Sequence, residues 1–143
     1  MRVPLFVYVV AVALVVFLCY SIVFYVKQIK KIAPHIVKIS VKLDKTYNLS
    51  GFCDSGNTLT HDGLPVCFVT KSFAGFTRYF ACQTLEGKTV DVEVTTVTGS
   101  TKVKAIKGEV TCNGVERQVY LALPVSKCKT MYNLILSGDF CGV

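Results

Sequence analysis

The pattern of hydrophobic and polar positions divides the 143-residue chain into two parts. Residues 3–26 contain no charged side chain and consist mainly of Val, Leu, Phe, Tyr and Ile. A run of this length exceeds the roughly 20 apolar residues that a helix needs to cross a bilayer. A cleaved signal peptide has a shorter apolar core, about 7–15 residues, and a small-residue cleavage site, which residues 20–25 do not provide. The pattern therefore predicts one transmembrane anchor over residues 1–26.

A different pattern begins after a basic linker, residues 27–34, which ends at Pro34. From residue 37 to residue 44 apolar and polar residues alternate strictly, which is typical of a half-buried strand. Residues 47–53 continue as a second strand after a turn at Lys45-Thr46. The two strands predict a hairpin that places Asp54 at its end.

Apolar runs separated by turn residues predict further short strands. We expect strands at 64–70, 80–85, 89–96, 102–110, 117–123 and 132–136, with a short helical turn over 72–79. Asp62-Gly63 and Asn113-Gly114 are strong hairpin signals. About eight short strands predict an all-β domain over residues 35–143, in the form of a small β-barrel or sandwich.

Charge predicts how the anchor is oriented. Residues 1–34 hold four basic and no acidic residues, whereas residues 35–143 hold twelve basic and nine acidic ones, so the net charge of +7 divides into +4 and +3. Lys27, Lys30, Lys31 and Lys38 follow the span and only Arg2 precedes it, so the positive-inside rule places the C-terminal domain in the cytoplasm. This basic cluster suits anionic lipid headgroups, and we expect no nucleic-acid partner.

Seven cysteines lie at positions 19, 53, 67, 82, 112, 128 and 141. Disulfides are rare in the reducing cytosol, so the predicted orientation favours free, mostly buried thiols. The cysteines form no C-x-x-C pair, and neither His35 nor His61 has a partner at zinc-finger spacing. We expect no metal and no cofactor.

Asp54 stands out because it is followed at once by Ser55, Gly56 and Asn57. These residue types are common in ordinary turns, but the same order also places the catalytic carboxylate of aspartic proteases. Peptide hydrolysis by carboxylates needs two of them close together, sharing one proton. The chain contains no second Asp-Ser/Thr-Gly. Two copies related by a two-fold axis could bring two Asp54 residues together, and a membrane anchor would raise their effective concentration.

Three segments carry a resemblance to a known family. They are Asp-Ser-Gly-Asn-Thr-Leu at 54–59, Pro-Val at 65–66, and the closing segment 131–136 with Gly138 after it. On these motifs, residues 35–143 resemble the C-terminal protease domain of the sporulation sigma-E factor-processing peptidases, membrane-bound aspartic proteases of endospore-forming bacteria. Members of that family carry a multi-span membrane domain, whereas this chain has one candidate span.

The resemblance implies a closed β-barrel of the retroviral aspartic protease type that acts as a homodimer. It implies that the protein removes the pro-sequence of an inactive sporulation sigma factor at the membrane, under the control of a signal protein. Asp54 would be the catalytic carboxylate of each copy. Ser55 and Gly56 would hold it by hydroxyl and amide hydrogen bonds, Asn57 would brace the turn, and Gly138 would buttress the site.

Two other functions are open to the sequence. Cys53 could be the nucleophile of a cysteine protease with His61 or His35 as the base, although nothing in the sequence orients such a base. The domain could also be a non-catalytic, membrane-tethered scaffold or sensor, because a fold does not establish an activity. For a substrate-covering flap, 86–88 and 98–100 are the candidates, and 98–100 is favoured.

Overall fold

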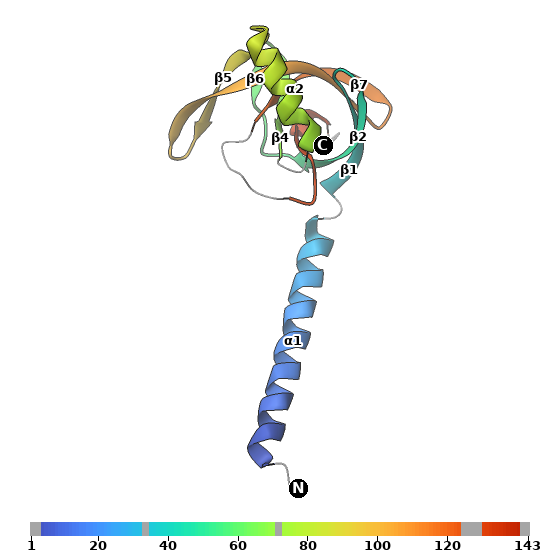
Figure 1. Cartoon of the computed structure of the whole chain (residues 1–143), viewed down its shortest axis with the longest axis vertical. Coiled ribbons are helices and arrows are strands. Elements are labelled where there is room, and N and C mark those ends of the chain that lie inside the picture. The colour runs from blue at the N-terminus through green and yellow to red at the C-terminus, as the bar shows by residue number, and fades with distance from the viewer. Residues whose placement is uncertain (1–3, 33–34, 71–72, 124–129, 141–143) are drawn as a thin grey trace. The chain divides into compact units, whose positions relative to one another are not determined.

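The chain forms two compact units, Met1–Pro34 and His35–Val143. A computed structural model describes residues 4–32, 35–70, 73–123 and 130–140 (Figure 1).

The first unit is one long helix, α1 (Leu5–Ile32). From Leu5 to Lys30 it is long and apolar enough to span a membrane. It extends beyond the predicted anchor, because the stretch that begins at Lys27 is helical up to Ile32 and does not form a separate linker. Lys, Gln and Ile are compatible with a helix. Along this stretch of the sequence, the first position that disfavours a helix is the one before Pro34.

The second unit is the expected all-β domain, built from eight strands among the described residues. They are β1 (Ile36–Lys42), β2 (Thr46–Asp54), β3 (Thr60–His61), β4 (Leu64–Val69), β5 (Val90–Thr96), β6 (Gly99–Cys112), β7 (Val115–Ala122) and β8 (Leu134–Ser137). Six of them pair in the closed order β1-β2-β8-β4-β7-β6 and back to β1. The β2–β8 and β4–β7 pairs are parallel and the other four are antiparallel. The prediction of a closed β-barrel preceded by a helix is confirmed.

The two strong turn signals form the hairpins that the sequence predicts. Asp62 and Gly63 have φ angles of 49° and 74°, and Asn113 and Gly114 have φ angles of 51° and 78°. Two successive residues with positive φ make the type I′ turn, whose twist matches that of paired strands. These turns join β3 to β4 and β6 to β7.

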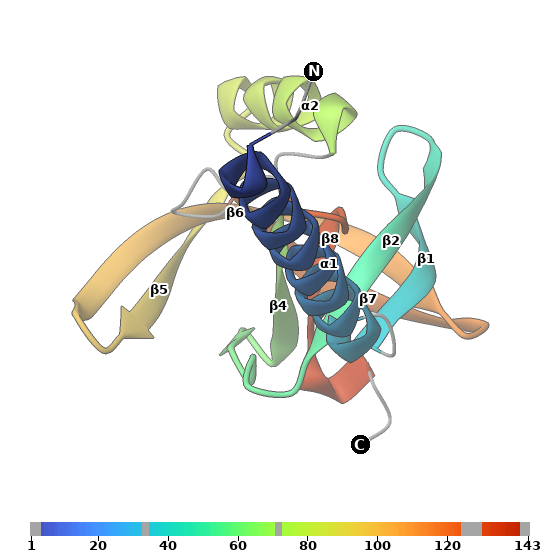
Figure 2. The same cartoon turned by 90° about the horizontal axis from the view of Figure 1, so that it is seen from below.

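One predicted strand is wrong. Residues 80–85 belong to helix α2 (Ala74–Leu85), which lies at one end of the barrel, with the β3–β4 hairpin towards the other end (Figure 2). Phe73, Phe76 and Phe80 recur at helical spacing, and all three are buried in the barrel core. The sequence predicted a hairpin because the last turn of α2 is rich in residues that strands also accept.

The strands bury side chains on both faces of the sheet. Cys67, Leu121 and Leu136 belong to the core inside the barrel. Their chain neighbours Val66 and Tyr120 belong to a second, smaller cluster, as expected where successive side chains of a strand point to opposite faces. The barrel therefore carries an apolar layer on the outside of β4, β5, β6 and β7.

We expect Leu136→Ala to lower the free energy of unfolding by about 2–5 kcal/mol, because Leu136 is fully buried and its removal leaves a cavity. Leu85→Ala is the matched control: Leu85 is 89% exposed at the end of α2, so the change should stay within about 0.5 kcal/mol. Denaturant-dependent hydrogen exchange of the full chain in lipid nanodiscs measures both. A large effect at Leu85 would contradict its place on an exposed helix end.

Candidate active site

Asp54 is the last residue of β2, and neighbouring strands hold that strand on both sides. β1 pairs with β2 from Ile36↔Phe52 to Lys42↔Thr46. On the other edge, β8 runs parallel to β2 and places Ser137 opposite Asp54. The predicted hairpin thus delivers the carboxylate, and β8 fixes the strand at the point where it ends.

The turn after β2 holds the Asp54 carboxylate through the backbone. The Gly56 amide donates a hydrogen bond to Asp54 Oδ1 at 2.9 Å, and the Asn57 amide donates to the Asp54 carbonyl oxygen at 3.0 Å. A Cβ at Gly56 would lie 3.2 Å from Asp54 Oδ1, so a side chain there would crowd the carboxylate. Ser55 is exposed, and among the described residues its hydroxyl forms no hydrogen bond to Asp54.

Asn57 ties this turn to the barrel through its side chain. It is only 9% exposed. Its Nδ2 donates to the Val66 carbonyl oxygen at 3.0 Å, and its Oδ1 accepts a longer hydrogen bond from the Leu59 amide at 3.4 Å. Asn57 therefore braces the turn against β4, the role that the resemblance implies for it.

The end of β8 holds the same turn from the other side. The Ser137 hydroxyl and the Gly138 amide both donate to the Asn57 carbonyl oxygen, each at 3.0 Å. At Gly138 a Cβ would lie 3.3 Å from the Ser55 carbonyl oxygen, so this close approach of two backbones favours glycine. We call these contacts the Asn57 clamp: the hydrogen bonds that Asn57 makes with Val66, Ser137 and Gly138.

The structure brings all five predicted site residues together: Asp54, Ser55, Gly56, Asn57 and Gly138. Ser137, which is fully buried, is the one that sequence reasoning missed. Its only signal is a small polar residue at the end of an otherwise apolar run. None of the ion pairs in the described part of the chain involves Asp54.

The cysteines differ in part from the expectation of free thiols. Cys67 and Cys112 are free and buried, and Cys82 is free but exposed. Burial raises the pKa of the Cys67 thiol to about 12, against the opposing effect of a hydrogen bond with the Ser137 backbone. Cys53, by contrast, is disulfide-bonded.

This disulfide argues against a cysteine protease, because a sulfur in a disulfide is not a nucleophilic thiolate. The two candidate bases have other neighbours. His61 Nε2 lies 3.6 Å from Asp62 Oδ2, and its ring meets that of Tyr120 edge-on. The His35 ring contacts that of Phe52, with 6.0 Å between the ring centres.

The two flap candidates have different structures. Residues 98–100 lie at the turn of the β5–β6 hairpin, which projects from the barrel (Figure 2), and Val97 at its tip is fully exposed. Glu86 and Gly87 instead close the last turn of α2, by donating to the carbonyls of Cys82 and Thr84. The prediction of a hairpin at 86–88 is wrong, so 98–100 is the remaining flap candidate.

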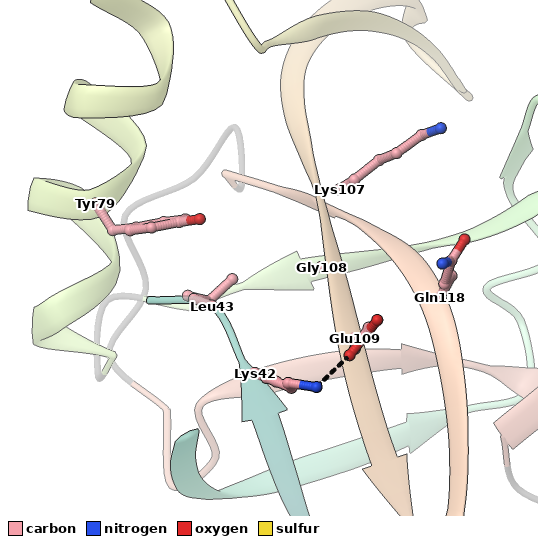
Figure 3. Close-up of a pocket in the computed structure, with 7 residues that line it drawn as sticks. All are labelled: Lys42, Leu43, Tyr79, Lys107, Gly108, Glu109 and Gln118. Carbon is pink, nitrogen blue, oxygen red and sulfur yellow. Dashed lines mark ion pairs between the residues drawn. The ribbon is translucent and has the colours of Figure 1, made fainter. Parts of the chain in front are cut away.

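One cleft of the described surface lies between α2 and β6. It has a volume of about 310 Å³, with Tyr79 on one side and the Lys42–Glu109 ion pair on another (Figure 3). Its lining is Lys42, Leu43, Tyr79, Lys107, Gly108, Glu109 and Gln118. None of the predicted site residues lines it.

Comparison with known proteins does not assign a family. No protein-family model matches the chain, and no curated protein matches it either. Among solved structures, the chain is similar to a protein of unknown function (DUF785) from Legionella pneumophila, with 14% sequence identity and a TM-score of 0.39. The alignment covers 74% of this chain and 82% of the Legionella chain. A similarity this distant carries no argument about function.

We expect Asn57→Ala to lower the free energy of unfolding by about 1–3 kcal/mol, because it leaves the Val66 carbonyl buried without its donor. Asn48→Ala is the matched control: it removes an exposed amide of β2, and should cost no more than about 0.5 kcal/mol. Hydrogen exchange of the full chain gives both values. Equal losses in the two variants would show that the Asn57 amide has no special structural role.

Proposed function

We propose that the protein is a membrane-anchored aspartic endopeptidase that acts as a homodimer. The observation that carries this proposal is the geometry of the 54–57 turn. The Gly56 amide holds one oxygen of the Asp54 carboxylate, and the Asn57 clamp anchors the turn to β4 and β8. A carboxylate set at the end of a rigid strand in this way is preorganised for chemistry.

The chemistry that we propose needs one Asp54 from each copy. Two carboxylates at short distance share one proton, because both cannot be ionised so close together. The ionised one takes a proton from water while the protonated one polarises the peptide carbonyl. With Oδ1 bound to the Gly56 amide, Oδ2 of each Asp54 is the oxygen that water and substrate would meet.

Other features of the chain fit this proposal. A two-fold axis beside Asp54 would bring the same residue of both copies together, and anchoring by α1 would confine the copies to one plane and favour pairing. The projecting β5–β6 hairpin would close over bound substrate as a flap. Closure of such a hairpin excludes water from the reaction.

The substrate that we propose is a protein at the membrane. On the resemblance of 54–59, 65–66 and 131–138, it is the precursor of a sporulation sigma factor that loses its pro-sequence, with a signal protein as activator. The lysines after the span favour a cytoplasmic side for the domain, where such a precursor would be found.

We expect Asp54→Asn to abolish cleavage of a candidate precursor co-expressed with the full chain, because an amide can neither take nor share the proton. Asp62→Asn is the matched control: the same chemical change in another turn, at a φ of 49° that Asn accepts readily. Immunoblotting of precursor and product measures cleavage. Asp54→Asn should also inhibit the co-expressed wild type, since random pairing at equal amounts leaves only about a quarter of the dimers with two Asp54 residues.

Three outcomes would contradict the proposal. Continued cleavage by Asp54→Asn would exclude the aspartic mechanism. If the wild type cleaves no precursor but binds one, the domain is a membrane-tethered scaffold or sensor. A loss of activity in proportion to the mutant dose, without inhibition of the wild type, would show that each copy works alone.

The orientation has its own test, because two features point to opposite sides of the membrane. The lysines after the span favour the cytoplasm, whereas the disulfide at Cys53 is of a kind that oxidising compartments favour. For a cytoplasmic domain, a membrane-impermeant maleimide should label the exposed Cys82 only after the cells are permeabilised. Cys67 should stay unlabelled in both conditions, because it is buried and its pKa of about 12 keeps the thiol protonated. Peptide mass spectrometry reads both sites, and labelling of Cys82 in intact cells would place the domain outside.

A further inference from the structure

A second surface feature, a polar groove, crosses the barrel away from the 54–57 turn. It has a volume of about 630 Å³ and is formed by β1, β2, the β6–β7 turn and the residue before β8. Its lining is Lys38, Ile39, Ser40, Asn48, Leu49, Ser50, Thr111, Asn113, Gly114 and Asn133. We call it the Asn48 groove.

The groove lies on the outer face of the sheet. Ile39 points into the barrel core, so its neighbours Lys38 and Ser40 point outward, as successive residues of a strand do. On the paired strands, Ser40 lies opposite both Asn48 and Thr111. The outer surface here is therefore made of hydroxyl and amide side chains with one ammonium group.

Hydrogen bonds within the sheet engage one end of each of the two side-chain amides, and for Asn133 the bond fixes which end. The Ser50 backbone amide donates to Asn133 Oδ1 at 3.0 Å, and because that group can only donate, the Asn133 oxygen must face it. The Ser40 hydroxyl donates to Asn48 Oδ1 at 2.9 Å. Both amide oxygens are thus engaged by the protein itself. Among the described residues neither Nδ2 has an acceptor, so the two NH₂ groups are left for a ligand.

The charge of the groove lining also indicates which kind of ligand fits the groove. Lys38 is the one ionised side chain among the lining residues, and it is exposed. Two free amide donors and one ammonium group suit a ligand rich in hydrogen-bond acceptors that carries negative charge.

The dimensions favour an extended peptide. Adjacent strands lie about 4.8 Å apart, so β2, β1 and β6 together present a surface about 10 Å across. An extended chain advances about 3.3 Å per residue, so about three residues cross the groove. Their carbonyl oxygens can accept from the two amides while an acidic side chain pairs with Lys38.

We propose that the Asn48 groove binds a short extended segment of an acidic polypeptide. This function is separate from peptide hydrolysis, because none of the groove residues belongs to the 54–57 turn or to the Asn57 clamp.

The test is peptide binding to the full chain in nanodiscs of neutral phosphatidylcholine. The probe is a fluorescein-labelled pentapeptide of alternating glycine and glutamate, followed by fluorescence anisotropy. Asn48→Asp and Asn133→Asp are the sharpest variants, because each keeps the Oδ1 acceptor that the sheet uses and replaces the free donor with a charged oxygen. Each should weaken binding about tenfold or more, since like charges then face each other. Lys38→Gln should weaken it several-fold and reduce its dependence on salt.

Gln118→Glu is the matched control, because it makes the same change from amide to carboxylate outside the groove, and it should leave binding unchanged. The same peptide with glutamine in place of glutamate should bind at least tenfold more weakly. Equal binding of the two peptides, or full affinity in Asn48→Asp, would overturn the proposal. It would also be overturned if inorganic phosphate or phosphatidylglycerol vesicles bind at the groove and the peptide does not. None of these readouts requires proteolysis, so they remain informative if Asp54 proves not to be catalytic.

Discussion

The carbonyl oxygen of Asn57 is the point on which the candidate active site depends. It accepts hydrogen bonds from the Ser137 hydroxyl and the Gly138 amide, while the side chain of the same residue holds the Val66 carbonyl. The partners are backbone groups or a short side chain with little freedom to move, so the turn cannot shift without breaking a buried hydrogen bond. These hydrogen bonds therefore determine where the Asp54 carboxylate lies.

Local patterns were enough to predict much of the fold and most of the site. Strict alternation over 37–44 predicted β1, and Asp62-Gly63 and Asn113-Gly114 predicted their hairpins, since in each case the determining residues are adjacent in the chain. Helix α2 was missed at residues 80–85 because Phe76 and Phe80, with Phe73 just before the helix, pack into the core, and such tertiary packing overrides the weak local preference there. Ser137 could not be assigned from sequence, because its role depends on a contact with a turn 80 positions away. Cys53 was expected to be a free thiol because the predicted compartment, the cytosol, is reducing. No residue near Cys53 in the sequence supported that expectation.

Side chains alternate along β2, so the two faces of this strand have different surroundings. Asn48, Ser50 and Asp54 share the outward face because they lie an even number of residues apart. Leu49 packs against the core from the other face. One face thus stabilises the barrel while the other offers polar groups at both ends of the strand. The proposed chemistry and the proposed recognition would both use the outward residues, and neither would draw on the side chains that form the core.

The parallel pairing of β2 with β8 also bears on when the protein can acquire its site during synthesis. β8 is the last barrel strand among the described residues, and its final residue Ser137 and the following Gly138 supply the two donors to the Asn57 carbonyl. A contact between segments this far apart closes a long loop, and this closure lowers the conformational entropy of the chain. Such a contact therefore forms late. A nascent chain that still lacks β8 can form the β1–β2 hairpin, but its Asp54 turn has no anchor on that side. The order of the strands therefore delays assembly of the carboxylate site until β8 has been translated.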